Sequence, residues 1–200
     1  MTTAVILAAG ESRRLGTPKQ LLKLGGTSLI VRIVEAALES RCRGVTITVG
    51  AHADRVRSEV EPYDVRVVDN PDWREGKASS IRVATDIVAR DLPPVSGILF
   101  LACDQPHVTA ALLNELLQRF EASGGRPSAC AYGTTVGIPA IVPRRLFGEL
   151  MRLRGDRGAQ TILCSPDETI ERVPFPEGLI DIDGAADAAA VGAVAVDPPD

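Results

Sequence analysis

Short apolar runs alternate, along the first half of the chain, with longer segments in which apolar residues recur every three or four positions. The short runs are rich in Val, Ile and Leu and cover residues 4–8, 45–49, 65–68 and 98–102. Continuous apolar runs of this length predict strands that are buried on both faces, and the spacing between them predicts helices with one apolar face. The pattern therefore predicts strands and helices in alternation.

Three amphipathic helices are predicted between and after these strands. The first follows Thr27, a typical N-cap residue, and ends near Gly44; the second covers residues 79–89, and the third begins after Thr109. Alternating strands and helices form right-handed βαβ units around a parallel sheet with helices on both faces. The sequence thus predicts a three-layer α/β domain.

The spacing of the apolar runs changes after Gly124. Predicted there are strands at 128–132 and 140–142, a helix at 145–153, and strands at 169–173 and 179–182. Since no long polar linker separates the halves, we expect the second half to extend the same mostly parallel sheet within one domain, residues 1–183. The Ala-rich residues 184–200 predict a short helix followed by a frayed tail.

Composition and charge exclude several classes of protein. Of the 200 residues 45% are hydrophobic, and 22 Lys and Arg against 26 Asp and Glu give a net charge of −4. Such a chain can bury a large core but lacks the basic surface that neutralises a nucleic-acid backbone. Its apolar runs are far shorter than the roughly 20 residues of a membrane span, and no basic stretch precedes the first of them. We expect a cytoplasmic protein that binds neither nucleic acid nor membranes.

The cysteines and histidines do not form a recognisable metal or catalytic pattern. Cys42, Cys103, Cys130 and Cys164 are far apart, without a C-x-x-C pair, and are expected to be reduced thiols. His52 and His107 are expected to be structural or surface residues, because neither belongs to a Ser-His-Asp or Cys-His arrangement.

The loop after the first predicted strand has the composition of a phosphate-binding loop. Residues 10–19, GESRRLGTPK, hold two glycines, two arginines and a lysine. Glycines let the backbone approach an anion, and Arg and Lys supply positive charge. In a doubly wound sheet this loop also lies at the carboxyl edge of the strands, where ligands bind. Its spacing fits neither G-x-x-x-x-G-K-[ST] nor G-x-G-x-x-G, so a solvated basic loop is the competing interpretation.

Two aspartates are candidate Mg²⁺ ligands. Asp104 directly follows the fourth predicted strand, at the same edge of the sheet as the first loop, although an Asp at that position can also serve as a turn residue. In the predicted strand at 179–182 and the residue after it, Asp181 and Asp183 would face the same side. Asp183 could then meet Asp104 across the site.

Two further polar segments are candidates for ligand contact. Residues 76–80, GKASS, precede or open the helix predicted at 79–89, so their hydroxyl and N–H groups would lie at its positive end; Ser79 or Ser80 could equally be a plain N-cap. Residues 137–139, GIP, and 154–159, RGDRGA, combine polar and turn-forming residues without defining a reaction.

Residues 7–22, LAAGESRRLGTPKQLL, resemble the L-A-A-G-x-S-x-R-x-G-x-P-K-x-L-L signature of the MobA-like nucleotidyltransferases. Later segments resemble the molybdenum cofactor cytidylyltransferase branch of that superfamily in order and spacing: NPDW at 70–73 with Gly76 and Ser79-Ser80, DQP at 104–106, GIP at 137–139 and GDRGA at 155–159. The resemblance covers about residues 3–183.

The resemblance implies a Rossmann-like nucleotidyltransferase fold and a Mg²⁺-dependent reaction. In that reaction CMP passes from CTP to molybdenum-bound molybdopterin, giving molybdopterin cytosine dinucleotide and pyrophosphate. It further implies that Arg14 and Lys19 hold phosphates and that Asp104 and Asp183 bind Mg²⁺. The residues that it implies for nucleotide binding are Ala8, Ala9, Gly10, Gly16, Lys19, Gly76, Ser79 and Ser80.

Two other functions compete with this interpretation. One is a nucleotidyltransferase that uses GTP, or that transfers CMP to another phosphorylated small molecule such as an isoprenoid or sugar precursor. Ala9 favours CTP, because guanylyltransferases resemble L-A-G-G at this position. The other is a chaperone that retains the nucleotide pocket but delivers the finished cofactor to a molybdenum hydroxylase. The presence of Lys19 and Asp104 favours an active enzyme. The chain departs from the family pattern at two places. The family usually continues D-I-D with T-P-E-D, whereas this chain has GAAD after Asp183. The family often has an arginine where this chain has Gln160.

Overall fold

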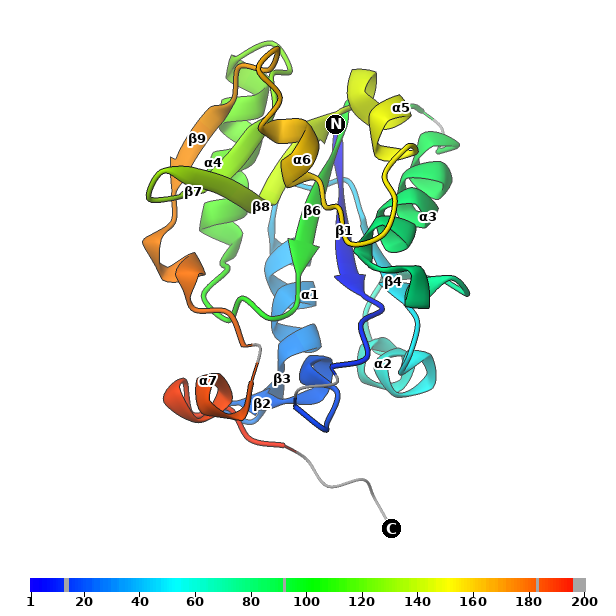
Figure 1. The fold of residues 1–200 in the computed structure, drawn as a ribbon, viewed down its shortest axis with the longest axis vertical. Helices are drawn as coiled ribbons and strands as arrows, with labels where there is room; N and C mark the ends of the chain where they lie inside the picture. Colours follow the sequence, from blue (N-terminus) through cyan, green and yellow to red (C-terminus); the bar gives the residue numbers. More distant parts are fainter. Residues whose placement is uncertain (13–14, 92, 183, 196–200) are drawn as a thin grey trace.

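The computed structural model describes residues 1–12, 15–91, 93–182 and 184–195 and centres on a seven-stranded sheet with the order β5-β4-β1-β6-β8-β7-β9 (Figure 1). The strands are β1 (Thr2–Ala8), β4 (Val45–Val49), β5 (Arg66–Asp69), β6 (Gly97–Ala102), β7 (Ser128–Tyr132), β8 (Thr135–Pro143) and β9 (Glu171–Pro174). The first four strands of this sheet in sequence order, β1, β4, β5 and β6, are parallel to one another. In contrast, β8 runs antiparallel to both β6 and β7. The predicted mostly parallel α/β sheet is confirmed.

Helices cover both faces of this sheet. They are α1 (Leu29–Glu39), α2 (Ala53–Val60), α3 (Lys77–Ala89), α4 (Ala110–Ala122), α5 (Phe147–Leu150) and α6 (Gln160–Leu163). A further short helix, α7 (Ala185–Ala190), packs in a separate cluster. Residues of α1, α2 and α4 share one buried cluster, and residues of α3, α5 and α6 share the other. In Figure 1, α6 accordingly lies in front of the sheet and α1 behind it.

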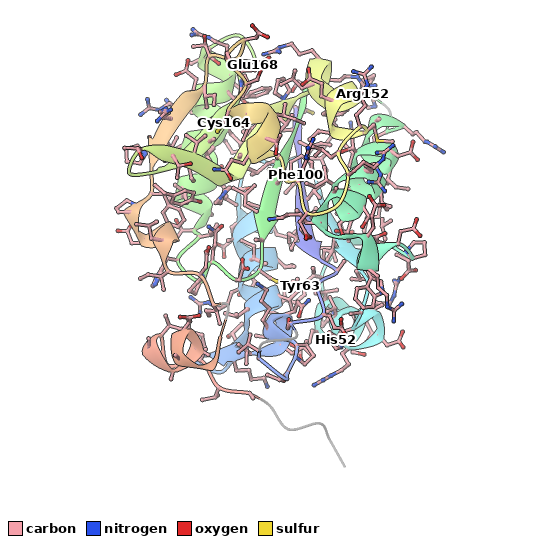
Figure 2. All side chains as sticks on the ribbon, in the orientation of Figure 1. His52, Tyr63, Phe100, Arg152, Cys164 and Glu168 are labelled. Atoms are coloured by element: carbon pink, nitrogen blue, oxygen red, sulfur yellow. The ribbon has the colours of Figure 1, made fainter. Side chains whose placement is uncertain are left out.

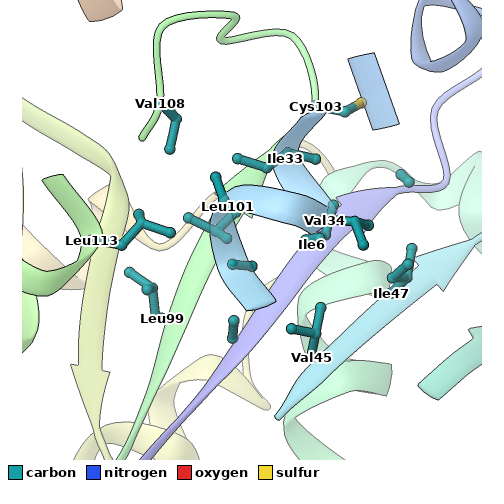
Figure 3. Close-up of a cluster of buried hydrophobic side chains, with 14 of the residues drawn as sticks. Ile6, Ile33, Val34, Val45, Ile47, Leu99, Leu101, Cys103, Val108 and Leu113 are labelled. Atoms are coloured by element: carbon teal, nitrogen blue, oxygen red, sulfur yellow. The ribbon is translucent and has the colours of Figure 1, made fainter. Parts of the chain in front are cut away.

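The apolar run of β1 explains why the sheet needs cover on both sides. Ala4, Ile6 and Ala8 belong to the cluster formed with α1, α2 and α4, whereas Val5 belongs to the cluster formed with α3. Figure 3 shows the first cluster, in which Ile6 lies close to Val34 of α1. Because side chains alternate along a strand, only a run that is apolar throughout can satisfy both layers.

Several predicted boundaries shift for local reasons. Thr109 caps α4 as predicted, with its Oγ1 accepting from the N–H of Leu112 at 3.3 Å, but α1 is capped by Ser28 instead of Thr27. The helix expected at 145–153 is a 3-10 turn (Arg144–Leu146) followed by the short α5. The strand expected at 179–182 is wrong: Pro176–Leu179 forms a 3-10 turn, and Ile182 then enters a buried cluster instead of joining the sheet.

Ile182 and residues 184–194 pack against the first loop and its hairpin, β2 (Lys23–Leu24) and β3 (Thr27–Ser28). Ile182 and residues in and after α7 form a cluster with Leu22 and Leu29. Val194 and Lys23 exchange two backbone hydrogen bonds, of 2.8 and 2.9 Å. No helix in the described ranges is long and apolar enough to cross a membrane.

Candidate active site

A cavity of about 1070 Å³ opens where β1 and β6 end, and its lining comes from both halves of the chain. Phe100 of β6, labelled near the centre of Figure 2, forms part of its wall. The first half contributes Ala9, Gly10, Ser12, Lys19, Gln20, Gly76, Lys77, Ser80, Asp104 and Gln105. The second half contributes Tyr132, Gly137, Ile138, Asp156, Arg157, Gly158, Leu179 and Asp181, among others.

Lys19 and Asp104 meet in this cavity although they are 85 residues apart in the chain. Lys19 begins a 3-10 turn (Lys19–Leu21) after the first loop, and Asp104 follows β6. The ammonium of Lys19 donates to Oδ2 of Asp104, and the side chains retain 21% and 18% exposure, so a ligand can reach both. The sequence predicted this proximity, because β1 and β6 are neighbouring parallel strands that end at the same edge.

The first loop is held from within by Gln20, which the sequence did not mark as a site residue. Its Nε2 donates to the carbonyls of Ala8 at 2.9 Å and Gly10 at 2.8 Å. The hydroxyl of Ser12 accepts from the N–H of Lys19 at 3.0 Å. In the sequence, this role of Gln20 is signalled only by its position, as a polar residue between the basic loop and the apolar pair Leu21-Leu22.

The start of α3 forms the adjoining wall. Its N-cap is Gly76, so the possibility that Ser79 or Ser80 is the cap is wrong. Instead, Nδ2 of the buried Asn70 donates to the hydroxyls of Ser79 and Ser80, at 2.8 and 2.9 Å, and Ser79 donates to the carbonyl of Gly76 at 2.8 Å. Ser80 lines the cavity, whereas Ser79 is buried behind it.

Residues 153–158 pack against the start of α3, and the last three of them line the cavity. The segment is fixed by an ion pair that the sequence did not reveal. Arg82 of α3 donates to Glu75 and, at 2.8 Å, to the carbonyl of Leu153, while the N–H of Gly155 donates to Glu75 at 3.3 Å. The hydrogen bonds from Arg82 lower the pKa of Glu75 to about 2, so Glu75 stays ionised at neutral pH. The pair thereby positions the segment that carries Asp156.

We expect Gly76→Ala to destabilise the protein and to disturb this wall. Gly76 has φ of 118°, and an added Cβ would lie 2.6 Å from both Oδ1 of Asp156 and the carbonyl of Gly155. The strained backbone alone should cost about 1–3 kcal/mol, measurable by urea unfolding. Gly158→Ala is the control, because its Cβ would meet only the flexible side chain of Lys77, at 3.5 Å. Equal stability of the two variants would contradict this account.

The far side of the cavity carries a polar network around Tyr132. Burial raises the pKa of Tyr132, so its neutral hydroxyl can donate to the carbonyl of Ile138. The same hydroxyl accepts from Nε2 of Gln105 at 3.1 Å. This network joins the residue after Asp104 to β7 and β8, so the second half of the chain has a fixed position relative to the Lys19–Asp104 pair.

The cavity holds no activated thiol. Burial raises the pKa of Cys103, which adjoins Asp104, to about 12, so it remains a protonated thiol. All four cysteines are free thiols, as expected. Within the described ranges no three His, Cys, Asp or Glu residues form a metal-binding group. The arrangement suits the stabilisation of charge on a bound substrate better than covalent catalysis.

The remaining predicted site residues have different positions. Ala8 is buried beneath the first loop, and Gly16 is exposed and does not line the cavity. Arg14 and Asp183 lie outside the described residues. The cavity therefore brings together Ala9, Gly10, Lys19, Gly76, Ser80 and Asp104.

A sequence model of the MobA-like NTP transferase domain matches residues 4–170, which include the first loop, Asp104 and residues 153–158. The chain belongs to this family. The resemblance seen in the sequence is thus confirmed at the level of the MobA-like family, and the fold agrees with it.

Proteins similar in sequence to this chain are named for different activities. The chain is 38% identical to nicotine blue oxidoreductase of Paenarthrobacter nicotinovorans, over 88% of this chain and 93% of that protein. It is 30% identical to the molybdenum cofactor guanylyltransferase of Rhizobium meliloti, over 74% of this chain and 66% of that protein. A crystal structure of Rv0371c from Mycobacterium tuberculosis superposes with a TM-score of 0.79 at 32% identity, covering 96% of this chain and 97% of that one. Rv0371c has also been solved in complex with manganese, at 29% identity, 95% and 97% coverage and a TM-score of 0.77.

Proposed function

We propose that this MobA-like protein transfers CMP from CTP to molybdenum-bound molybdopterin, giving molybdopterin cytosine dinucleotide and pyrophosphate. The observation that carries the proposal is the Lys19–Asp104 pair in a cavity of about 1070 Å³. This volume lies just above the roughly 300–1,000 Å³ of a site for one drug-sized ligand, which is compatible with a site that takes a nucleotide and an acceptor. The first loop and α3 would bind the nucleotide, and the side formed by Gln105, Tyr132 and Ile138 would bind the acceptor.

The proposed reaction needs no protein nucleophile. An oxygen of the acceptor's terminal phosphate attacks the α-phosphorus of CTP, and the bond from that phosphorus to pyrophosphate breaks. Lys19, together with Arg14, would hold phosphate oxygens and neutralise the charge that develops on them. Ala9, Gly10, Gly76 and Ser80, which line the cavity, are the proposed nucleotide-binding residues. Ala8, Gly16 and Ser79, which the sequence also proposed, do not line it and would act through their neighbours.

The residues present fit a divalent cation. Asp104 offers a partly exposed carboxylate, and Mg²⁺ is commonly bound by one or two carboxylates together with substrate phosphates. We therefore propose Asp104, with Asp183, as the Mg²⁺ ligands. The metal would supply charge neutralisation at the phosphates, which is consistent with the manganese complex of Rv0371c.

The choice of nucleotide provides the experiment. Ala9 lines the cavity and carries a methyl group that glycine lacks, so a larger purine should be crowded there. One methyl group discriminates by about 1–3 kcal/mol, so kcat/KM for CTP should exceed that for GTP by about 10- to 200-fold. Ala9→Gly should narrow the gap. Pyrophosphate release would be measured from each of the four nucleoside triphosphates, with and without molybdopterin. Equal turnover of GTP and CTP would show that the cytidylyltransferase branch is the wrong choice.

The relative named nicotine blue oxidoreductase favours a second candidate function, a redox reaction in the same cavity, because its match spans most of both chains. Oxidation of NADH or NADPH in the presence of nicotine blue would detect it. Redox turnover without pyrophosphate release from any nucleotide would replace the proposed transfer. A third role, delivery of the finished cofactor to a molybdenum hydroxylase in the cytoplasm, would be detected as transfer of bound product to such an enzyme.

A further inference from the structure

The carbonyl groups at the start of the first loop are all occupied by protein donors. Gln20 is 1% exposed, and its Nε2 donates to the carbonyls of Ala8 and Gly10, at 2.9 and 2.8 Å. The carbonyl between them, that of Ala9, accepts from the N–H of Ala51 at 3.2 Å. Three consecutive carbonyl oxygens are therefore directed to protein donors and are not left for a ligand.

Unlike these carbonyl groups, the N–H groups at the start of the first loop have no protein partner within the described ranges. Ala9 and Gly10 line the cavity, yet no residue in the described part of the chain accepts a hydrogen bond from either N–H. Lys19, whose ammonium lies in the same cavity, follows at the end of the loop. Adjacent N–H groups without acceptors, next to a cation, form an anion-binding nest.

We propose that Gln20 is a positioning residue that creates this nest. By binding the carbonyls of Ala8 and Gly10, it leaves the N–H groups of Ala9 and Gly10 for a phosphate group. That the phosphate belongs to a nucleoside triphosphate rests on the proposed function. Both hydrogens of the amide are used, and the hydroxyl of Ser12 donates to its Oε1 at 3.4 Å, so the amide has only one orientation that satisfies the loop.

Two substitutions separate the shape of Gln20 from its hydrogen bonding. Gln20→Met keeps a similar length but donates no hydrogen bond. Gln20→Glu keeps the shape but cannot donate to both carbonyls, because it has one hydrogen when protonated and none when ionised, and the ionised form would set a carboxylate against two carbonyl oxygens. Thr85→Val is the control, since Thr85 is equally buried and donates to the carbonyl of Ile81 at 2.7 Å, but does not line the cavity.

The probe is inorganic tripolyphosphate, titrated into the full chain by calorimetry. We expect Gln20→Met to raise its Kd about tenfold or more, since one lost hydrogen bond can account for such a change, and Gln20→Glu to raise it further. Thr85→Val should lower Tm without changing this Kd. In the wild-type protein, the NMR signals of the Ala9 and Gly10 N–H groups should shift as tripolyphosphate is added.

The inference is wrong if folded Gln20→Met binds tripolyphosphate as tightly as the wild type. It is also wrong if saturating tripolyphosphate leaves the N–H signals of Ala9 and Gly10 unchanged in the wild type, a result that decides the matter even where a variant does not fold. Failure of the proposed function has a different signature. The wild type would then bind tripolyphosphate in a Gln20-dependent way, yet release no pyrophosphate from any nucleotide with the acceptor present.

Discussion

Asp104→Asn should lower kcat for the proposed pyrophosphate release by about a thousandfold, because Asp104 is the proposed Mg²⁺ ligand and metal-ion stabilisation of transition-state charge is worth several kcal/mol. The amide keeps the shape of the carboxylate but removes the charge that Mg²⁺ requires. It also frees the ammonium of Lys19, which donates to Asp104 in the structure, so nucleotide affinity should be retained. Initial rates at several Mg²⁺ concentrations would measure both effects.

Asp69→Asn is the matched control for this substitution. Asp69 also lies at the carboxyl end of a parallel strand, β5, but it is exposed, pairs with Arg57 at 2.6 Å and does not line the cavity. Its kcat should equal that of the wild type. Full activity of Asp104→Asn at limiting Mg²⁺ would show that Asp104 is only a turn residue. Asp183→Asn should act in the same direction if Asp183 is the second ligand.

Lys19→Ala should lower kcat by roughly 100- to 1000-fold, with a much smaller change in KM for the nucleotide. A cation that faces a phosphoryl group contributes most when charge moves in the transition state, so its loss should affect turnover more than binding. Steady-state kinetics of pyrophosphate release would give both constants. Since Lys19 and Asp104 are in contact, the double variant should be less impaired than the product of the single effects.

Lys23→Ala is the control for Lys19. Lys23 lies just beyond the same loop, does not line the cavity, and its two hydrogen bonds to Val194 come from the backbone, which the substitution keeps. An unchanged kcat is therefore expected. If Lys19→Ala retained wild-type turnover as well, the lysine would be a structural residue of the loop.

The first half of the fold could be predicted because its strands are buried on both faces. An apolar run such as that of β1 has few other structures available to it, and two parallel neighbours necessarily end at one edge, which places Lys19 near Asp104. The run at 179–182 was less informative. It has the composition of a strand, but Leu179 ends a 3-10 turn and Ile182 joins the C-terminal cluster, a contact that only the tertiary structure determines.

The polar groups that shape the site could not be predicted for a related reason. Gln20, Glu75 and Arg82 resemble ordinary surface residues in the sequence, and their roles depend on carbonyl and N–H groups brought to them by distant segments. Ser79 and Ser80 have the composition of a helix cap, yet Gly76, with its positive φ, occupies the capping position. The composition of residues 76–80 therefore indicated that this segment contributes to the site, but it did not indicate which hydrogen bonds the segment makes.

The contact between Lys23 and Val194 bears on how the protein is synthesised. The hairpin that follows the first loop is synthesised more than 150 residues before residues 184–194, which pack on Leu22 and pair with Lys23. Domains generally begin to fold during synthesis. A nascent chain can thus assemble β1, β4 and β6 early, but its first loop lacks these packing partners until residues 184–194 have also emerged. Chains that stop before Ile182 should therefore bind the proposed nucleotide poorly.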